Sequence, residues 1–292
     1  MIRGIYAPIP TPFKNDLIDY ESLKSNLALW AKTPLTGLVV LGSNGEFAYL
    51  SYEEKVELIR FVRNNLPAEK HVIAGTGCES TIETIKLTNK AAELGCLAGL
   101  ILTPHYYKAA MSNKALYNYY KEVADASNMP IMLYNMPRNA GINMSSDLVL
   151  SLANHANIVG IKDSSGNIVQ IAEVCAKAPG DFAVFAGSGS FLLPALAVGA
   201  VGGTLAVANI MPSECVELLN KLKSGDLKGA KELQYLLLAP NKAVTAKYGI
   251  AGLKTALDLI GYKGGEVRKP MLSVSNEVIK DIRNILIEAK AL

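Results

Sequence analysis

The chain has 292 residues, half of them hydrophobic and 19% charged, and its net charge is +3. This composition supplies a large apolar core and excludes an intrinsically disordered chain. The mild positive charge includes no basic run, so nucleic acid is a poor candidate partner. The length exceeds that of most single domains, but α/β barrels of about 250 residues form one domain.

The cysteines and the N-terminus bear on the compartment. The N-terminus lacks the apolar stretch of a signal peptide. The four cysteines show no zinc-like spacing, which favours a reducing, cytoplasmic location. The uncharged segment 191–212 is long enough to span a bilayer, but its proline and glycines predict a short helix and a strand of a barrel core. The cysteines are Cys78, Cys96, Cys175 and Cys215.

Apolar, β-favouring runs recur along the chain with helical stretches between them. The runs are continuous rather than alternating, as expected of parallel strands buried on both faces. The expected strands are 4–9, 37–41, 71–75, 98–103, 130–134, 158–162, 182–186 and 202–207. The helices expected between them are 52–66, 81–94, 114–126, 146–154 and 168–178.

This alternation predicts an α/β protein with a (β/α)8 TIM barrel, and a doubly wound open sheet is the alternative. Capping boxes, Ser51 with Glu54 and Ser80 with Glu83, are predicted at two helix starts. Further helices are expected at 213–223, 227–238, 244–259 and 276–291. We therefore expect a barrel over 1–224 that carries the active site, and a C-terminal helical appendage over 225–292.

A lysine stands where the sixth run ends. The apolar residues 157–161 lead to Lys162, and polar residues with a glycine follow. Burial at a strand end disfavours the charged ammonium, and a neutral amine forms Schiff bases with ketones and aldehydes. A lone lysine in such a place is more commonly a surface residue, so the hypothesis depends on the other strand ends.

The carboxyl ends of barrel strands meet at one face, so their residues are candidates for one site. After the second run, Gly42 and Gly45 bracket Ser43 and Asn44, which leaves backbone N–H groups free for a carboxylate or phosphate. A turn before a helix has the same pattern. The fifth run ends in Tyr134, whose phenol is a candidate general acid and base. A core tyrosine with a bonded hydroxyl is the alternative.

Three further features at the strand ends are weaker candidates. His105 could act as a base, but a single histidine in a loop is more often structural. The glycine- and serine-rich stretch 187–190 could bind phosphate, although it lacks the lysine and spacing of a P-loop. Glu46 could be a general base, and we expect it rather to orient its loop.

Four segments at these strand ends together resemble one enzyme family. They are 42–46 (GSNGE), 134–137 (YNMP), 160–163 (GIKD) and 186–188 (AGS). Their order and positions are similar to those of the dihydrodipicolinate synthase/N-acetylneuraminate lyase superfamily of pyruvate-dependent class I aldolases. The resemblance covers essentially the whole chain.

The resemblance implies a role for each of five residues. Lys162 forms a Schiff base with pyruvate, and Tyr134 relays protons. Ser43 and Asn44 hold the pyruvate carboxylate. Ser43 also links Tyr134 to a tyrosine of a neighbouring subunit, which by position is Tyr106.

The same resemblance implies substrate contacts by Ser164 and by the backbone of Gly187. It implies that no metal or organic cofactor is needed, because the lysine itself supplies the electron sink. It also implies a homotetramer built as a dimer of dimers, with small 2-oxo acids as substrates and no nucleic acid or membrane partner.

Two departures from the synthases favour another subgroup. Synthases usually have two threonines where this chain has Ser43 and Asn44. They also place an arginine five residues after the strand-five tyrosine, to hold the carboxylate of aspartate semialdehyde. Here that position is Asn139, and Arg138 stands one residue early, where its guanidinium is expected to point elsewhere. Asn139 is therefore a candidate specificity residue.

Further segments resemble the 4-hydroxy-2-oxoglutarate aldolases of the same superfamily, although catalysis by itself does not demand a match in the C-terminal region. These segments are 42–47, 77–81, 162–164, 240–245 and 261–265. The sequence thus favours an aldolase that forms a Schiff base on Lys162 and reversibly cleaves 4-hydroxy-2-oxoglutarate to pyruvate and glyoxylate.

Two alternatives stay open. One is 4-hydroxy-tetrahydrodipicolinate synthase, which condenses pyruvate with aspartate semialdehyde; the displaced arginine is the discriminating feature. The other is a binding protein on a catalytically retired barrel. The joint presence of Lys162, Tyr134 and Ser43 argues against it, since a retired site has no physical reason to keep them.

Overall fold

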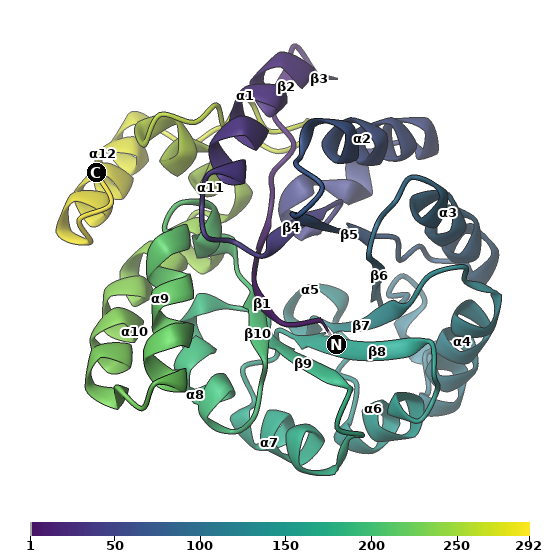
Figure 1. Cartoon of the computed structure of the whole chain (residues 1–292). Helices are drawn as coiled ribbons and strands as arrows, with labels where there is room; N and C mark the ends of the chain where they lie inside the picture. The colour runs from purple at the N-terminus through teal and green to yellow at the C-terminus, as the bar shows by residue number, and fades with distance from the viewer. Residues whose placement is uncertain (1) are drawn as a thin grey trace.

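The computed structural model describes residues 2–292 and shows a closed barrel ringed by helices (Figure 1). Within these residues eight parallel strands close in the order β1-β10-β9-β8-β7-β6-β5-β4. The predicted (β/α)8 TIM barrel is therefore confirmed, and each expected run overlaps one strand. The barrel strands are β1 (Gly4–Pro8), β4 (Gly37–Val40), β5 (His71–Gly75), β6 (Ala98–Leu102), β7 (Ile131–Asn135), β8 (Ile158–Asp163), β9 (Ala183–Ala186) and β10 (Gly202–Thr204).

Both faces of these strands are buried, which explains their continuous apolar sequences. One cluster fills the barrel interior and includes Tyr6, Met132 and Phe185. The other lies between the sheet and the surrounding helices. Side chains therefore pack the inside of the barrel as a core rather than leaving a pore. The helices of the barrel are α1 (Tyr20–Ala31), α2 (Tyr52–Asn65), α3 (Thr81–Glu93), α4 (Asn113–Ala126), α5 (Pro137–Ala140), α6 (Ser146–Ala153), α7 (Ile168–Lys177) and α8 (Leu192–Ala197).

The two predicted capping boxes differ in the structure. At the start of α2, the Glu54 N–H donates to Ser51 Oγ and the Ser51 N–H donates to the Glu54 carboxylate, so this box is confirmed. At α3, Ser80 accepts from the Glu83 N–H, but the Glu83 carboxylate lies 3.8 Å from the Lys86 ammonium instead. The second box was therefore predicted wrongly, because an exposed carboxylate can turn toward a cation one turn on.

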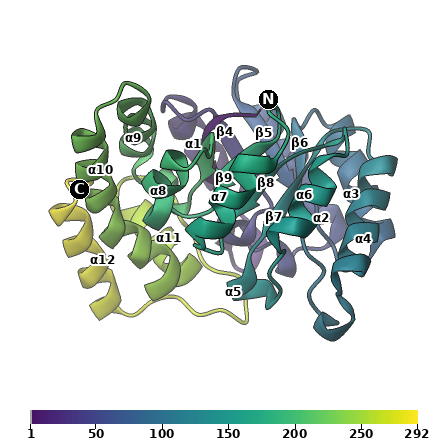
Figure 2. The same ribbon diagram turned by 90° about the horizontal axis from the view of Figure 1, so that it is seen from below.

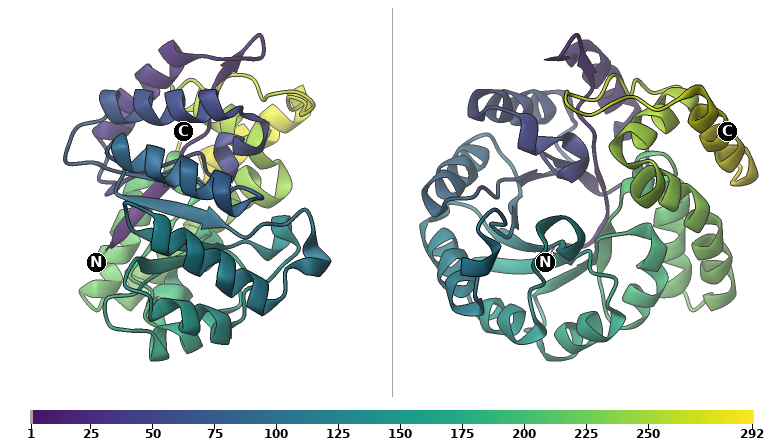
Figure 3. Two further views of the ribbon diagram at one scale, coloured as in Figure 1. Left: turned by 90° about the vertical axis from the view of Figure 1, so that its right-hand side faces the viewer. Right: turned by 180° about the vertical axis from the view of Figure 1, so that it is seen from behind.

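Short elements near the N-terminus escaped prediction. Strands β2 (Phe13–Lys14) and β3 (Leu17–Ile18) form a small hairpin before α1. An isolated bridge pairs Phe13 with Glu266, so this hairpin lies beside the C-terminal segment, as the purple and yellow ribbons of Figures 1 and 3 show. Elements of two residues are too short to give a periodic signal.

The C-terminal helices stack against one side of the barrel (Figure 2). The expected end of the second of them at 238 is wrong: α10 continues through Pro240 and passes into a π-helix, Ala243–Lys247. Leu237 and Leu253 join the same core cluster as the barrel helices. The division at 224/225 stays a prediction. These helices are α9 (Pro212–Lys223), α10 (Leu227–Lys242), α11 (Gly249–Leu259) and α12 (Asn276–Glu288).

The uncharged segment 191–212 contains the short helix α8 and the strand β10, as predicted. Across residues 2–292, no helix is long and apolar enough to cross a membrane. All four cysteines are free thiols.

Candidate active site

Lys162 and Tyr134 lie side by side at the carboxyl ends of two neighbouring strands. Tyr134 on β7 pairs in register with Lys162 on β8. The Lys162 Nζ lies 4.1 Å from the centre of the Tyr134 ring, and both side chains are buried. This end of the barrel lies opposite the N-terminus. Helix α5 lies at the same end as Lys162 and Tyr134 (Figure 2). Lys162 is thus buried beside the Tyr134 phenol and is not a surface residue.

The Tyr134 hydroxyl lies in a polar setting. Ser43 Oγ lies 3.5 Å from it, across the barrel mouth. Burial raises the pKa of Tyr134, but the Lys162 charge and hydrogen bonds from neighbouring side chains lower it further, so the net pKa lies below its usual value. A phenol whose pKa is lowered this way exchanges its proton more readily near neutral pH.

A buried polar network holds the two strand ends behind this pair. The Asp163 carboxylate accepts hydrogen bonds from the Asn135 side chain at 2.9 Å, the Gln170 side chain at 3.0 Å and the Ser165 N–H at 2.8 Å. The main chain of Asp163 accepts from the Gly187 N–H at 2.7 Å. Strands β7, β8 and β9 are therefore joined beside the site, which restricts the movement of Lys162.

A cavity of about 340 Å³ opens over Lys162 and Tyr134. Ser164 Oγ is buried there and has no hydrogen-bond partner among the described residues, so it is available to a bound molecule. Gly187 packs directly against Ser164, because a Cβ at position 187 would lie 1.9 Å from Ser164 Oγ. The other predicted contact residues that line this cavity are Ser43, Asn44 and Asn139.

The loop after β4 presents both backbone and side-chain groups. Ser43 and Asn44 open a 3-10 turn, Ser43–Gly45, so their backbone N–H groups precede its first internal hydrogen bond. The Asn44 side chain donates to the Pro8 carbonyl at 3.1 Å and so anchors the loop to β1. A carboxylate in the cavity can therefore meet main-chain N–H donors and the Ser43 hydroxyl.

Arg138 also lines the cavity, contrary to expectation. It lies with Asn139 on the one-turn helix α5, and both residues reach the same cavity. The sequence offset alone suggested that the guanidinium points elsewhere, but a helical turn brings neighbouring side chains around to one mouth. The cavity thus has a cation as well as an amide at its rim.

The C-terminal helices contribute a wall that sequence reasoning missed. Thr245 of the π-helix, Ile250 of α11 and Met271 all line the cavity. The stretch 240–245 resembles the aldolases, but its sequence alone gives it no part in the site. Turns of π-helix are frequently found at functional sites, and this one faces the cavity.

Tyr106 lies apart from this cavity in the single chain. Its side chain is 74% exposed and stacks edge-to-face on Tyr107. It follows His105, whose imidazole Nδ1 lies 2.9 Å from the Glu79 carboxylate. Glu79 also accepts from the N–H groups of His105 and Tyr106, which makes His105 part of a structural contact. The role of Tyr106 across a subunit interface stays a prediction.

The fold and the lysine–tyrosine pair are those of a carbon–carbon lyase that works through a Schiff base. The model of the Dihydrodipicolinate synthetase family matches residues 1–289. The chain therefore belongs to that family. Membership supports an enzyme and argues against a catalytically retired barrel.

Known relatives span the same length. The 4-hydroxy-tetrahydrodipicolinate synthase of Methanothrix thermoacetophila is 35% identical, with 98% of this chain and 96% of that protein covered. The synthase of Geobacter sp. is 35% identical over the full length of both chains. These names do not support the closer resemblance to 4-hydroxy-2-oxoglutarate aldolases that the sequence favoured.

Solved structures agree with this fold. A crystal structure of dihydrodipicolinate synthase from Thermotoga maritima superposes with a TM-score of 0.95 at 31% identity, over 100% of both chains. A prophage protein of the dihydrodipicolinic acid synthase family from E. coli K12, in complex with pyruvate, superposes with a TM-score of 0.94 at 28% identity, over 100% of both chains.

Proposed function

We propose that this protein condenses pyruvate, held as a Schiff base on Lys162, with aspartate semialdehyde. The observation that carries the proposal is the position of Arg138 on the rim of the cavity that contains Lys162. A guanidinium there can bind the carboxylate of a second substrate in a bidentate manner. The names of the relatives, 4-hydroxy-tetrahydrodipicolinate synthase, support the same reaction.

The first half of the reaction uses the buried pair. Lys162 as the free amine attacks the pyruvate ketone, and loss of water from the carbinolamine gives an iminium. Tyr134 supplies and takes up the protons of these steps, with Ser43 Oγ 3.5 Å away as the next group in the relay. The N–H groups of Ser43 and Asn44 hold the pyruvate carboxylate, and Ser164 Oγ offers a further hydrogen bond.

The second half forms the carbon–carbon bond. Loss of a methyl proton converts the iminium into an enamine, with the iminium nitrogen as electron sink. The enamine carbon attacks the aldehyde carbon, and the aldehyde oxygen takes up a proton. The amine of aspartate semialdehyde, or water, then displaces the product from Lys162. Holding both substrates in one cavity makes this addition effectively intramolecular.

A second candidate is reversible cleavage of 4-hydroxy-2-oxoglutarate to pyruvate and glyoxylate. Ser43 and Asn44, which stand in place of the two threonines usual in the synthases, favour it. Asn139, which stands where the synthases usually have an arginine, favours it as well. Both substrates carry a carboxylate on the aldehyde half, so Arg138 is compatible with either. The two reactions share every step on Lys162 and differ only in the partner of the enamine.

A head-to-head assay of the purified chain separates the two. One arm supplies pyruvate with aspartate semialdehyde and follows condensation; the other supplies 4-hydroxy-2-oxoglutarate and follows pyruvate release. We expect the first arm to show the higher kcat/KM. A clear preference for the second arm would contradict the synthase proposal and support the aldolase.

Two matched variants test the rim residues. We expect Arg138→Ala to raise the KM for aspartate semialdehyde about 10-fold, because a charged hydrogen bond to its carboxylate is lost, and to leave borohydride trapping of pyruvate unchanged. Asn139→Ala removes the neighbouring side chain without removing a charge and is the control. An equal increase in this KM in the two variants would show that the Arg138 charge does not bind the carboxylate.

A further inference from the structure

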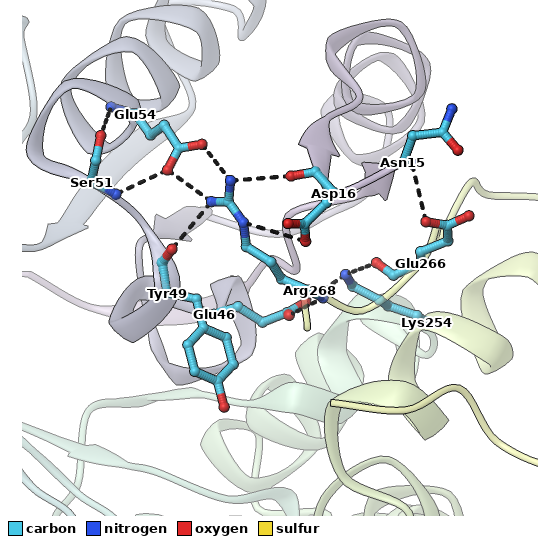
Figure 4. A network of polar contacts seen from close by, with 9 residues as sticks. All are labelled: Asn15, Asp16, Glu46, Tyr49, Ser51, Glu54, Lys254, Glu266 and Arg268. Atoms are coloured by element: carbon cyan, nitrogen blue, oxygen red, sulfur yellow. Dashed lines mark hydrogen bonds and ion pairs between the residues drawn. The ribbon is translucent and has the colours of Figure 1, made fainter. Parts of the chain in front are cut away.

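A fully buried ion pair joins the barrel loop to the C-terminal region (Figure 4). The Lys254 Nζ lies 2.5 Å from the Glu46 carboxylate, and the side chains are 2% and 0% exposed. Removing two charges from water is expensive, and a buried pair is often no more stable than apolar residues of similar volume. Stability alone therefore does not account for this pair. Glu46 comes directly after the loop of Ser43 and Asn44, which contacts pyruvate in the proposed function.

The same pair fixes the main chain of the C-terminal segment. The second oxygen of Glu46 accepts a hydrogen bond from the Arg268 N–H at 2.8 Å. Lys254 donates to the Glu266 carbonyl at 2.5 Å. The Arg268 guanidinium in turn binds both oxygens of Glu54, each at 2.7 Å. Glu46 and Lys254 thus each bind the main chain of residues 266–268 and hold this segment against the barrel.

Lys254 and Arg268, the two C-terminal partners of Glu46, lie close in sequence to residues that line the cavity. Ile250 lies one turn before Lys254 on α11, and Met271 follows Arg268 by three residues. Ile250 and Met271 form part of the wall of the cavity above Lys162. The ion pair therefore links the loop to the C-terminal residues that line the same cavity.

The loop has anchors that do not depend on the pair. Thr11 Oγ1 donates to the Gly45 carbonyl at 2.8 Å, and the Asn44 side chain donates to the Pro8 carbonyl at 3.1 Å. Met271 lies outside the helices, so its position depends on how the segment before it is bonded. The C-terminal segment also keeps contacts outside the pair, from the Arg268 guanidinium to Glu54 and from the Glu266 N–H to the Phe13 carbonyl. Loss of the pair is therefore expected to shift the wall locally without releasing the segment.

We propose that the Glu46–Lys254 ion pair is a positioning device that holds Ile250 and Met271 at a set separation from the pyruvate loop and so determines the space left for the second substrate. The proposal rests on the proposed function only in that a second substrate enters this cavity. It makes Glu46 and Lys254 positioning residues and not catalytic ones.

The test is the double variant Glu46→Gln/Lys254→Gln, which removes both charges and keeps hydrogen-bonding side chains of similar length. We expect the rate of pyruvate trapping by borohydride to stay within about 2-fold of wild type, because the loop keeps its own anchors. We expect the KM for the second substrate to rise at least 10-fold with kcat changed much less. The exposed Lys90–Glu93 pair, replaced as Lys90→Gln/Glu93→Gln, is the matched control and should change neither quantity.

Two more variants connect the effect to the wall. Met271→Ala should raise the same KM, and its effect should be smaller in the double-variant background, because both changes act through one wall. Glu46→Asp keeps both charges and shortens the carboxylate arm. It should fold and raise this KM by a smaller factor, which provides a test even if the double variant does not fold.

Three results would overturn the proposal. They are an unchanged KM for the second substrate in Glu46→Asp or in the folded double variant, an equal loss of pyruvate trapping and of second-substrate binding, and fully additive effects with Met271→Ala. Failure of the proposed function is seen separately, in the wild type. If wild-type protein turns over 4-hydroxy-2-oxoglutarate but not aspartate semialdehyde, the same comparisons are made with the KM for glyoxylate in the condensation direction.

Discussion

At the scale of single residues, the two groups to which we assign the chemistry, Lys162 and Tyr134, meet because β7 and β8 are neighbours in register. The Lys162 ammonium lies against the face of the Tyr134 ring, with its Nζ 4.1 Å from the ring centre. A cation there is attracted to the face of the ring, and it also stabilises the phenolate form of Tyr134. The reactivity of each group is therefore expected to depend on the other.

Replacement of the lysine tests the covalent step. Lys162→Ala should abolish turnover and the mass increase that pyruvate and borohydride produce in the wild type, since among residues 2–292 no other lysine lines this cavity. The fold should persist, as judged by circular dichroism. Lys90→Ala, at an exposed position, is the control. Wild-type turnover in Lys162→Ala would end the Schiff-base assignment.

Replacement of the tyrosine tests proton transfer. Tyr134→Phe removes only the hydroxyl that lies 3.5 Å from Ser43 Oγ. We expect kcat to fall by about 10²–10⁴-fold, the usual contribution of a positioned acid–base group. Steady-state kinetics measure it. A decrease of only a few-fold would show that protons reach the reacting atoms by another route.

The charge of Lys162 also sets the titration of Tyr134. A positive charge favours the phenolate and lowers the pKa, whereas burial raises it. Lys162→Ala removes the cation and leaves the burial, so the pKa of Tyr134 should rise. The tyrosinate absorbance of this variant, minus that of Lys162→Ala/Tyr134→Phe, measures the change. An unchanged or lowered pKa would contradict the assigned cause.

At the scale of elements, the helices α2 and α3 differ in the hydrogen bonds that cap their first turns. The start of α2 has a full capping box, and Glu54 of that box also binds the Arg268 guanidinium with two hydrogen bonds. The start of α3 has only the serine half of a box. Similar sequences at two helix starts thus give different numbers of bonds, because Glu83 turns toward Lys86 whereas Glu54 keeps its box bond and also binds Arg268.

This difference predicts unequal costs for the same substitution. Glu54→Ala should lower the free energy of unfolding by about 1–3 kcal/mol, because charged hydrogen bonds are lost and Arg268 is left without them. Glu83→Ala removes only a long, exposed contact with Lys86 and should cost about 0.5 kcal/mol or less. Denaturant unfolding of both variants gives the comparison. Equal costs would mean that the Arg268 contact adds nothing to α2.

For the molecule as a whole, assembly is the main expectation that a single chain leaves untested. Tyr106 and Tyr107 are 74% and 72% exposed, and their rings contact each other in the loop after β6. Aromatic side chains that stand out from a fold in this way are typical of the buried part of an interface. They fit the expected subunit contact through which Tyr106 would approach Ser43 and Tyr134 of a neighbour.

Sedimentation velocity tests this expectation. The wild type should sediment as a tetramer of the 31.2 kDa chain. Tyr106→Ala should weaken the assembly and lower kcat, because the third member of the proton relay is lost. Tyr235→Ala, at another exposed tyrosine, should do neither. A fully active wild-type monomer would rule out a role for Tyr106 across an interface.

The sequence by itself determined the barrel and selected the candidate residues at the centre of the site. Strands buried on both faces must be apolar throughout, so their runs are visible without any tertiary information. The barrel then brings the strand ends to one face, which is why Lys162, Tyr134 and Ser43 could be selected together. Hydrophobicity and spacing place these residues at strand ends, and the family resemblance supplies their expected roles.

Only the tertiary structure decided what surrounds that centre. The turn of α5 brings Arg138 to the cavity despite its offset in the sequence. Met271 reaches the same cavity from the far end of the chain, and Glu46 pairs with Lys254 across 208 positions. Contacts between segments so distant depend on how whole elements pack against one another, and no local pattern of residues records that packing.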